Sequence, residues 1–73
     1  MNVTITPMQT EKILTGNHTF SLMSFSMLIT RLKVVYAKDP SQAILQNCTN
    51  EINAFLAKYG AIMEKDSLAI LEL

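Results

Sequence analysis

The feature that most constrains the fold is a helix break near the middle of the chain, at Lys38-Asp39-Pro40-Ser41. Apolar residues recur at intervals of three and four on both sides of this break, which is typical of amphipathic helices. Asp39 is a good N-cap residue, and Pro40 suits the first position of a helix. Proline also disfavours helical backbone at the residue before it. One helix is therefore predicted to end here and another to begin. A loop this short makes the two helices antiparallel neighbours in an αα-hairpin.

The segment before the break carries a long helical pattern. It predicts a helix over residues 20–38 with Thr19 as its N-cap. The apolar residues that share its first face are Leu22, Phe25, Ile29, Leu32 and Tyr36. The alternative is a short strand over residues 30–36, because apolar and polar residues alternate there. The helical pattern is the longer of the two, so the helix is favoured.

The same helix has a second apolar face, roughly opposite the first. Its residues are Met23, Met27 and Val34. A hairpin in a single chain uses only one face of each helix, and a helix that is apolar on two sides lies between neighbours. We therefore expect this face to lie in an interface, and the chain to form a homodimer that completes a helical bundle. The C-terminal residues that we assign to the same interface are Leu68, Ile70 and Leu71.

The segment after the break predicts a second helix over residues 40–59, which ends at Gly60. Its apolar face comprises Leu45, Cys48, Ile52, Phe55 and Tyr59, widened by Ile44 and Leu56. The polar residues expected to lie mostly away from the centre of this face are Gln42, Gln46, Thr49, Asn50, Asn53 and Lys58. This helix thus has one apolar face and one face in contact with water.

Residues 1–19 have two interpretations. Thr6 followed by Pro7 predicts an N-cap and the start of a short helix over residues 7–14, with Gly16 as its stop. The residues of this helix expected to face the core are Met8, Ile13 and Leu14. The alternation over residues 3–6 instead indicates a short strand, in an otherwise weakly structured segment.

Residues 61–73 also have two interpretations. We interpret the charged cluster Glu64-Lys65-Asp66 as a solvated turn, after which a short helix begins with Asp66 or Ser67 as its cap. The alternative is a strand over residues 68–73 that pairs with the N-terminal strand. The helix is favoured. The apolar end indicates docking on the chain's own core or on a second chain. It also allows the alternative that the sequence is the N-terminal fragment of a longer protein.

The size of the chain favours self-association. Its 73 residues form a single all-α domain, and 49% of them are hydrophobic. A domain of about 60 residues buries only about 60% of the surface of its unfolded chain, so a monomer leaves large apolar side chains in water. Only 16% of the residues are charged and the formal net charge is zero. This composition is unlike that of a disordered tail, and two copies meet without electrostatic repulsion.

No pattern in the sequence indicates catalysis, and we expect a non-catalytic protein with no cofactor and no metal. The single cysteine, Cys48, cannot form an intramolecular disulfide. Together with the single histidine, His18, it cannot supply the four ligands of a structural zinc site. Cys48 lies on an apolar helix face, so we predict that it is a small buried residue.

Cellular location is inferred from what the chain lacks. Residues 1–7 show no basic region followed by an apolar run, and an unpaired cysteine suits a reducing compartment. The most apolar stretch, residues 20–36, is short for a membrane span and contains Arg31 and Lys33. These patterns predict a cytoplasmic protein without a membrane span.

The function expected from these patterns is self-association or protein–protein binding through apolar helix faces. One alternative is a small regulatory DNA-binding protein that uses the basic edge of Arg31, Lys33 and Lys38. The zero net charge makes nucleic acid an unlikely partner, because phosphate neutralisation drives such binding. The other alternative is a peptide that lies on a membrane surface through residues 20–29. Its polar face carries serines where such helices carry cations.

Overall fold

The computed structural model describes residues 4–59, 66 and 69–70. It contains α1 (Pro7–Thr15), α2 (Met23–Lys38) and α3 (Gln42–Tyr59). No strand occurs among the described residues, which confirms the all-α prediction for that part of the chain. The strand considered over residues 30–36 is wrong, because this segment lies within α2.

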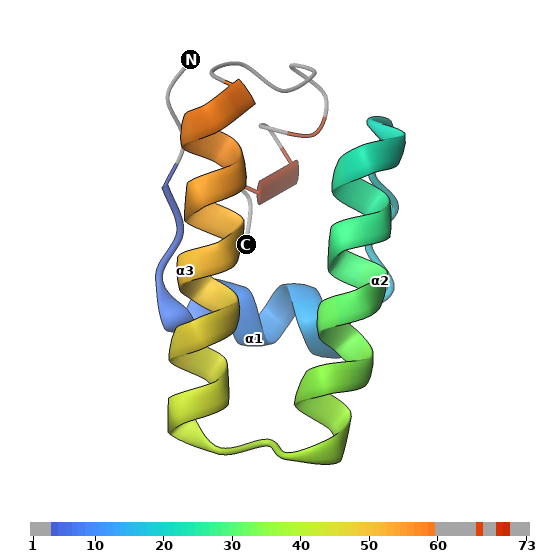
Figure 1. The fold of residues 1–73 in the computed structure, drawn as a ribbon. Helices are drawn as coiled ribbons and strands as arrows, with labels where there is room; N and C mark the ends of the chain where they lie inside the picture. Colours follow the sequence, from blue (N-terminus) through green and yellow to red (C-terminus); the bar gives the residue numbers. More distant parts are fainter. Residues whose placement is uncertain (1–3, 60–65, 67–68, 71–73) are drawn as a thin grey trace.

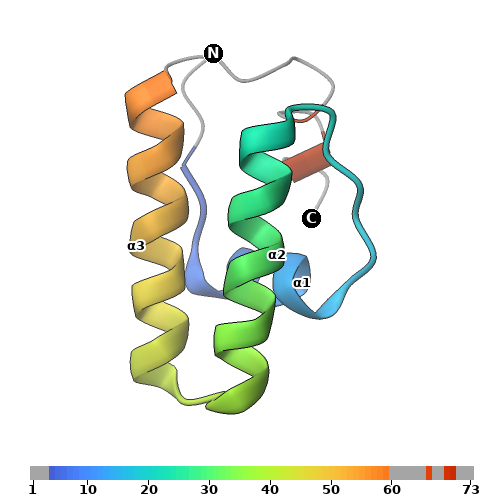
Figure 2. The same ribbon diagram turned by 45° about the vertical axis from the view of Figure 1, so that its right-hand side comes forward.

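The three helices pack around one core. Helices α2 and α3 run in opposite directions on either side of the short connection at residues 39–41, and α1 crosses behind them (Figure 1). Each helix contacts the other two. The extended residues 4–6 run along α3 before α1 begins (Figure 2).

Helix α1 begins as the sequence predicts. The Gln9 backbone N–H donates to the Thr6 hydroxyl at 3.3 Å, and the Thr6 backbone N–H donates to Gln9 Oε1 at 2.9 Å. This capping box, with Pro7 at the first helical position, satisfies backbone donors that the helix start leaves without partners. The predicted cap at Thr6 is therefore confirmed.

The inward face of α1 differs from the prediction at one position. Ile13 and Leu14 are buried as expected, but Met8 is 70% exposed. The third buried residue is Thr10, which precedes Ile13 and Leu14 by three and four positions and so shares their face. Met8 precedes Ile13 by five positions and lies on another side of the helix.

Helix α2 begins three residues later than predicted. Its first residue is Met23, and Thr19 is exposed and lies outside the helix. The N-cap position falls on Leu22, whose side chain makes no capping hydrogen bond. Instead, Asp66 accepts hydrogen bonds at 2.6 Å and 3.0 Å from the backbone N–H groups of Ser21 and Leu22. A carboxylate from the far end of the chain thus holds the entry to this helix.

Helix α3 also begins later than predicted, at Gln42. The Ser41 hydroxyl accepts a hydrogen bond from the Ile44 backbone N–H at 3.2 Å, and the Ser41 carbonyl accepts from Leu45 at 2.9 Å. Ser41 is therefore the N-cap, in place of Asp39, and Pro40 lies in the connection. The predicted stop at Gly60 lies outside the described residues.

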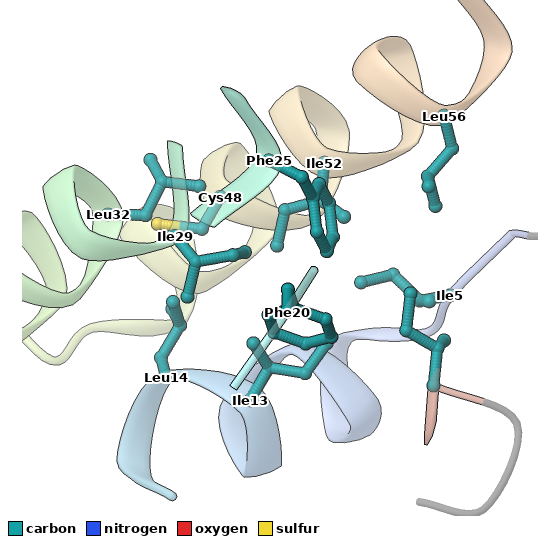
Figure 3. Packing of buried hydrophobic residues seen from close by; sticks show 11 residues of the cluster. Ile5, Ile13, Leu14, Phe20, Phe25, Ile29, Leu32, Cys48, Ile52 and Leu56 are labelled. Carbon is teal, nitrogen blue, oxygen red and sulfur yellow. The ribbon is translucent and has the colours of Figure 1, made fainter. Parts of the chain in front are cut away.

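The core joins all three helices with the segments around them (Figure 3). The predicted inner face of α2 is confirmed at its centre, where Phe25, Ile29 and Leu32 are buried. The predicted face of α3 is likewise buried at Leu45, Cys48, Ile52 and Leu56. The Phe25 ring meets the Phe20 ring edge to face, with centroids 4.8 Å apart, and the Phe55 ring at 5.3 Å. Burying one such side chain contributes about 1.5–3 kcal/mol to stability.

The described part of the C-terminal segment lies against this core. Asp66 and Ile70 are almost completely buried, and the backbone of Asp66, Ala69 and Ile70 is helical. The interpretation of Asp66 as part of a solvated turn is therefore wrong. The helical backbone at Ala69 and Ile70 also contradicts the strand alternative at these two positions. Glu64, Lys65 and the remaining residues of this segment lie outside the described part of the chain.

Candidate interaction surface

The exposed surface of α2 carries a stripe of large apolar side chains. Met23 is 74% exposed, Met27 66% and Val34 54%. At about 3.6 residues per turn, these three positions lie on the opposite side of α2 from the buried Phe25 and Leu32. The two-faced helix expected from the sequence is therefore present, and its outer face has no partner within the described part of the chain.

Thr30 completes this stripe between Met27 and Val34. Its side chain is exposed, and its hydroxyl donates to the Ser26 carbonyl at 3.0 Å. The one hydroxyl proton in the stripe thus already has an acceptor within the helix, so covering Thr30 with apolar side chains leaves no unmet donor. We call the surface formed by Met23, Met27, Thr30 and Val34 the α2 stripe.

Of the three C-terminal residues assigned to the same interface, the structure describes Ile70, which lies elsewhere. Ile70 is completely buried in the core of this chain. It therefore docks on the chain's own core, which is one of the two outcomes considered for the C-terminal segment. Leu68 and Leu71 lie outside the described residues. The α2 stripe is thus the part of the predicted interface that lies on the described surface.

The proposed basic edge is divided between two sides of α2. Arg31 Nη2 forms an ion pair with Glu51 Oε1 on α3 at 2.7 Å. Lys33 Nζ donates to the Gly16 carbonyl beyond α1 at 2.9 Å. Two residues apart on a helix, Arg31 and Lys33 point to opposite flanks. Only Lys38 shares the flank of Arg31, so the three cations do not form one surface.

Cys48 and His18 do not form a nucleophilic pair. Cys48 is 1% exposed on the inner face of α3, whereas His18 is exposed in the connection between α1 and α2. Burial raises the pKa of the Cys48 thiol, Glu51 raises it further, and Arg31 opposes both. The thiol is therefore protonated at neutral pH and is a poor nucleophile. Within the described residues, no group of three His, Cys, Asp or Glu side chains is placed to hold a metal ion.

Two polar contacts, one buried and one partly buried, were not anticipated from the sequence. Thr49 is buried, and its hydroxyl donates to that of Thr10 at 2.7 Å, while Thr10 donates to the Thr6 carbonyl at 3.0 Å. Asn53 binds both backbone groups of Ile5, accepting from its N–H at 2.8 Å and donating to its carbonyl at 3.0 Å. These contacts tie α1 and the extended N-terminal segment to α3.

A signal for the buried threonine is present in the sequence. Leu45, Thr49, Ile52 and Leu56 are spaced by four, three and four residues, so Thr49 belongs to the apolar face as fully as Cys48 does. The expectation that Thr49 and Asn53 lie away from this face gave too much weight to their polarity. A polar residue at a core-facing position indicates a buried hydrogen-bond partner.

The described helices include none with both the length and the apolar character needed to cross a membrane. Comparison of the chain with protein-family models, with curated proteins and with solved structures found no match. The physical properties of the α2 stripe therefore carry the functional argument.

Proposed function

We propose that this chain is a non-catalytic association module that forms a homodimer through the α2 stripe. The single observation that supports this proposal most strongly is the exposure of Met23, Met27 and Val34 on one side of a well-packed helix. Contiguous exposed apolar side chains on a small domain are typical of interaction surfaces. Methionine suits such a surface because its unbranched side chain adapts to the shape of a partner.

The packing on the other side of α2 supports the same proposal. Phe25 and Leu32 are fully buried, so the inner face already has its partners. Association through the stripe then adds apolar burial without disturbing the core. In the dimer, the two α2 helices meet through their stripes, and each α3 stays packed on the inner side of its own α2, so that the four helices form one bundle.

The DNA-binding alternative finds less support in the arrangement of the cations. Arg31 and Lys33 are both engaged within the chain and lie on opposite flanks of α2. A phosphate backbone would have to compete with Glu51 for Arg31. Protein association is therefore the function that we put forward.

The test is the mass of the full chain in solution, measured by light scattering after gel filtration. We expect the wild-type chain to be dimeric at micromolar concentration and Met27→Glu to be monomeric, because a charge in the centre of the stripe must be desolvated on association. Ala54→Glu is the matched control, since Ala54 is exposed on α3, and it should remain dimeric. A monomeric wild-type chain, or a dimeric Met27→Glu variant, contradicts the proposal.

A further inference from the structure

The sulfur atoms of the described residues are divided between the surface and the core. The methionines are on the surface, where Met8 is 70% exposed, Met23 74% and Met27 66%. Cys48, the only cysteine of the chain, is 1% exposed within the core. In the described part of the chain, the thioethers are therefore open to small reagents in water, whereas the thiol is enclosed.

This division decides which sulfur reacts with hydrogen peroxide. A cysteine reacts as its thiolate. The burial of Cys48 blocks access to its sulfur and also raises the pKa of the thiol, so that it stays protonated. A methionine needs no deprotonation. Its sulfur attacks one peroxide oxygen, the O–O bond breaks, an S–O bond forms and water leaves, so that sulfur is oxidised to the sulfoxide and peroxide is reduced.

Two of the exposed methionines lie in the α2 stripe. Met23 and Met27 are four residues apart, so they are neighbours on one face of the helix. The one hydroxyl proton in the stripe, that of Thr30, is already donated to the Ser26 carbonyl at 3.0 Å. A sulfoxide oxygen in the stripe therefore finds no free donor within it. Covering this oxygen with apolar side chains costs free energy, because a polar group loses its water without gaining a hydrogen bond.

Oxidation of the stripe leaves the core unchanged. The buried hydrophobic residues in the described part of the chain are isoleucines, leucines, phenylalanines and Cys48, with no methionine among them. The inner face of α2 packs through Phe25, Ile29 and Leu32. An oxygen added to Met23 or Met27 thus changes the outer face of the helix and not the packing of its inner face.

We propose that the α2 stripe is a redox-sensitive surface, in which peroxide converts Met23 and Met27 to sulfoxides and thereby abolishes association through the stripe while the fold persists. This inference rests on the proposed function and adds its regulation. It depends on side chains of this chain alone, since the polarity of the stripe changes on its own sulfur atoms.

The test treats the full chain with hydrogen peroxide and measures its mass by light scattering after gel filtration. Peptide mapping by mass spectrometry locates the added oxygen atoms, and circular dichroism measures the helix content. We expect the wild-type chain to change from a dimer to a monomer as Met23 and Met27 gain oxygen, with its helix content unchanged.

Leucine substitutions identify the methionines that are responsible. Met23→Leu/Met27→Leu keeps an apolar stripe of similar volume that cannot form a sulfoxide, so it should remain dimeric in peroxide. Met8→Leu is the matched control, because Met8 is similarly exposed but lies on α1, outside the stripe. This control should still dissociate. Met1 and Met63 lie outside the described residues, and both variants retain them.

The other outcomes separate the two proposals. A wild-type chain that is monomeric before peroxide is added overturns the proposed function and this inference with it. Three results overturn the inference and leave dimerisation intact: a dimer that persists with sulfoxides at Met23 and Met27, a dimer in which only Met8 gains oxygen, and a Met23→Leu/Met27→Leu variant that dissociates in peroxide. Loss of helix content during oxidation also overturns it, because dissociation would then follow from unfolding.

Discussion

At the scale of single residues, polar side chains decide how the apolar core is held in place. The hydroxyls of Thr10 and Thr49 meet inside the protein at 2.7 Å, and neither side chain is exposed to water. Among the described residues, no buried side-chain nitrogen or oxygen lacks a hydrogen-bond partner. Such contacts contribute modestly when made, and they are costly when one partner is removed.

The buried threonine pair gives a direct prediction for stability. Thr49→Val keeps the shape of the side chain and removes its hydroxyl, so we expect the free energy of unfolding to fall by about 1 kcal/mol. Thr15→Val, at an exposed position, should change it by less than about 0.5 kcal/mol. Urea unfolding at one fixed protein concentration measures both. In the double variant Thr10→Val/Thr49→Val, the free energy of unfolding should fall by less than the sum of the losses in the two single variants. Losses that simply add up would contradict a direct contact between the two hydroxyls.

Tyr36 gives a prediction for the dependence on pH. Its hydroxyl donates to Glu11 Oε2 at 3.0 Å, and this hydrogen bond, partial burial and the charge of Glu11 all raise the pKa of the phenol. Because the folded pKa lies above that of the unfolded chain, the contact stabilises the fold below about pH 10. This contribution to stability is lost as the pH rises through the pKa of Tyr36 in the folded chain. Tyr36→Phe identifies which part of the tyrosinate absorbance change belongs to Tyr36. Glu11→Gln should lower the pH at the midpoint of that change. An unchanged midpoint would sink this interpretation.

At the scale of the elements, the helix starts show how local and distant caps differ. Helix α1 is capped by Thr6 and α3 by Ser41, and each cap immediately precedes its helix. The entry to α2 instead relies on Asp66, which is 44 and 45 positions away from the two backbone groups that it binds. Capping from such a distance exists only after the C-terminal segment has docked.

The start of α3 allows a test of which residue caps it. Asp39 is the cap expected from the sequence, and Ser41 is the cap that the structure shows. Ser41→Ala removes the acceptor for the Ile44 N–H, and we expect a loss of about 1 kcal/mol in the free energy of unfolding. Asp39→Ala changes an exposed residue in the connection, so its effect should stay within about 0.5 kcal/mol. Thermal and urea unfolding both measure the difference. The reverse ranking would mean that Asp39 is the cap.

The entry to α2 gives a matched comparison between two aspartates. Asp66→Ala leaves the N–H groups of Ser21 and Leu22 without their acceptors, and we expect a loss of about 1–3 kcal/mol. Hydrogen exchange at the start of α2 should accelerate in the same variant, because its first turn then frays more often. Asp39→Ala is the control, because it makes the same substitution at an exposed aspartate in the connection. Unaltered exchange at Ser21 and Leu22 would be incompatible with the capping role.

At the scale of the whole molecule, the two sides of α2 have different roles. The inner side joins the core through Phe25, Ile29 and Leu32, whereas the outer side presents the α2 stripe to water. In the dimer that we propose, a second copy buries the stripe, and this links folding to association. The protein concentration then becomes a determinant of stability.

This link predicts a thermal midpoint that depends on protein concentration. A dimer that dissociates on unfolding becomes more stable as its concentration rises, so the wild-type Tm should fall as the protein is diluted a hundredfold. The Tm of Met27→Glu should stay constant, because this variant unfolds as a monomer. Differential scanning calorimetry measures both series. A wild-type Tm that does not change with concentration would argue against an obligate link between folding and dimerisation.

The sequence alone predicted the elements that depend on local information. The break before α3, the N-cap at Thr6 and the inner faces of α2 and α3 all follow from the identity and spacing of neighbouring residues. These features need no knowledge of the rest of the molecule, because apolar periodicity and caps act within a few residues. The exposed outer face of α2 was also readable from its spacing.

Only the tertiary structure decided the contacts between distant positions. It brought Asp66 to the start of α2, Asn53 to Ile5 and Thr49 to Thr10. Each of these polar residues looks solvent-exposed by type, but Asp66 and Thr49 are buried and Asn53 is half-buried, because a distant partner satisfies their hydrogen bonds. A single sequence contains no direct record of such pairing, since it arises when the segments pack together.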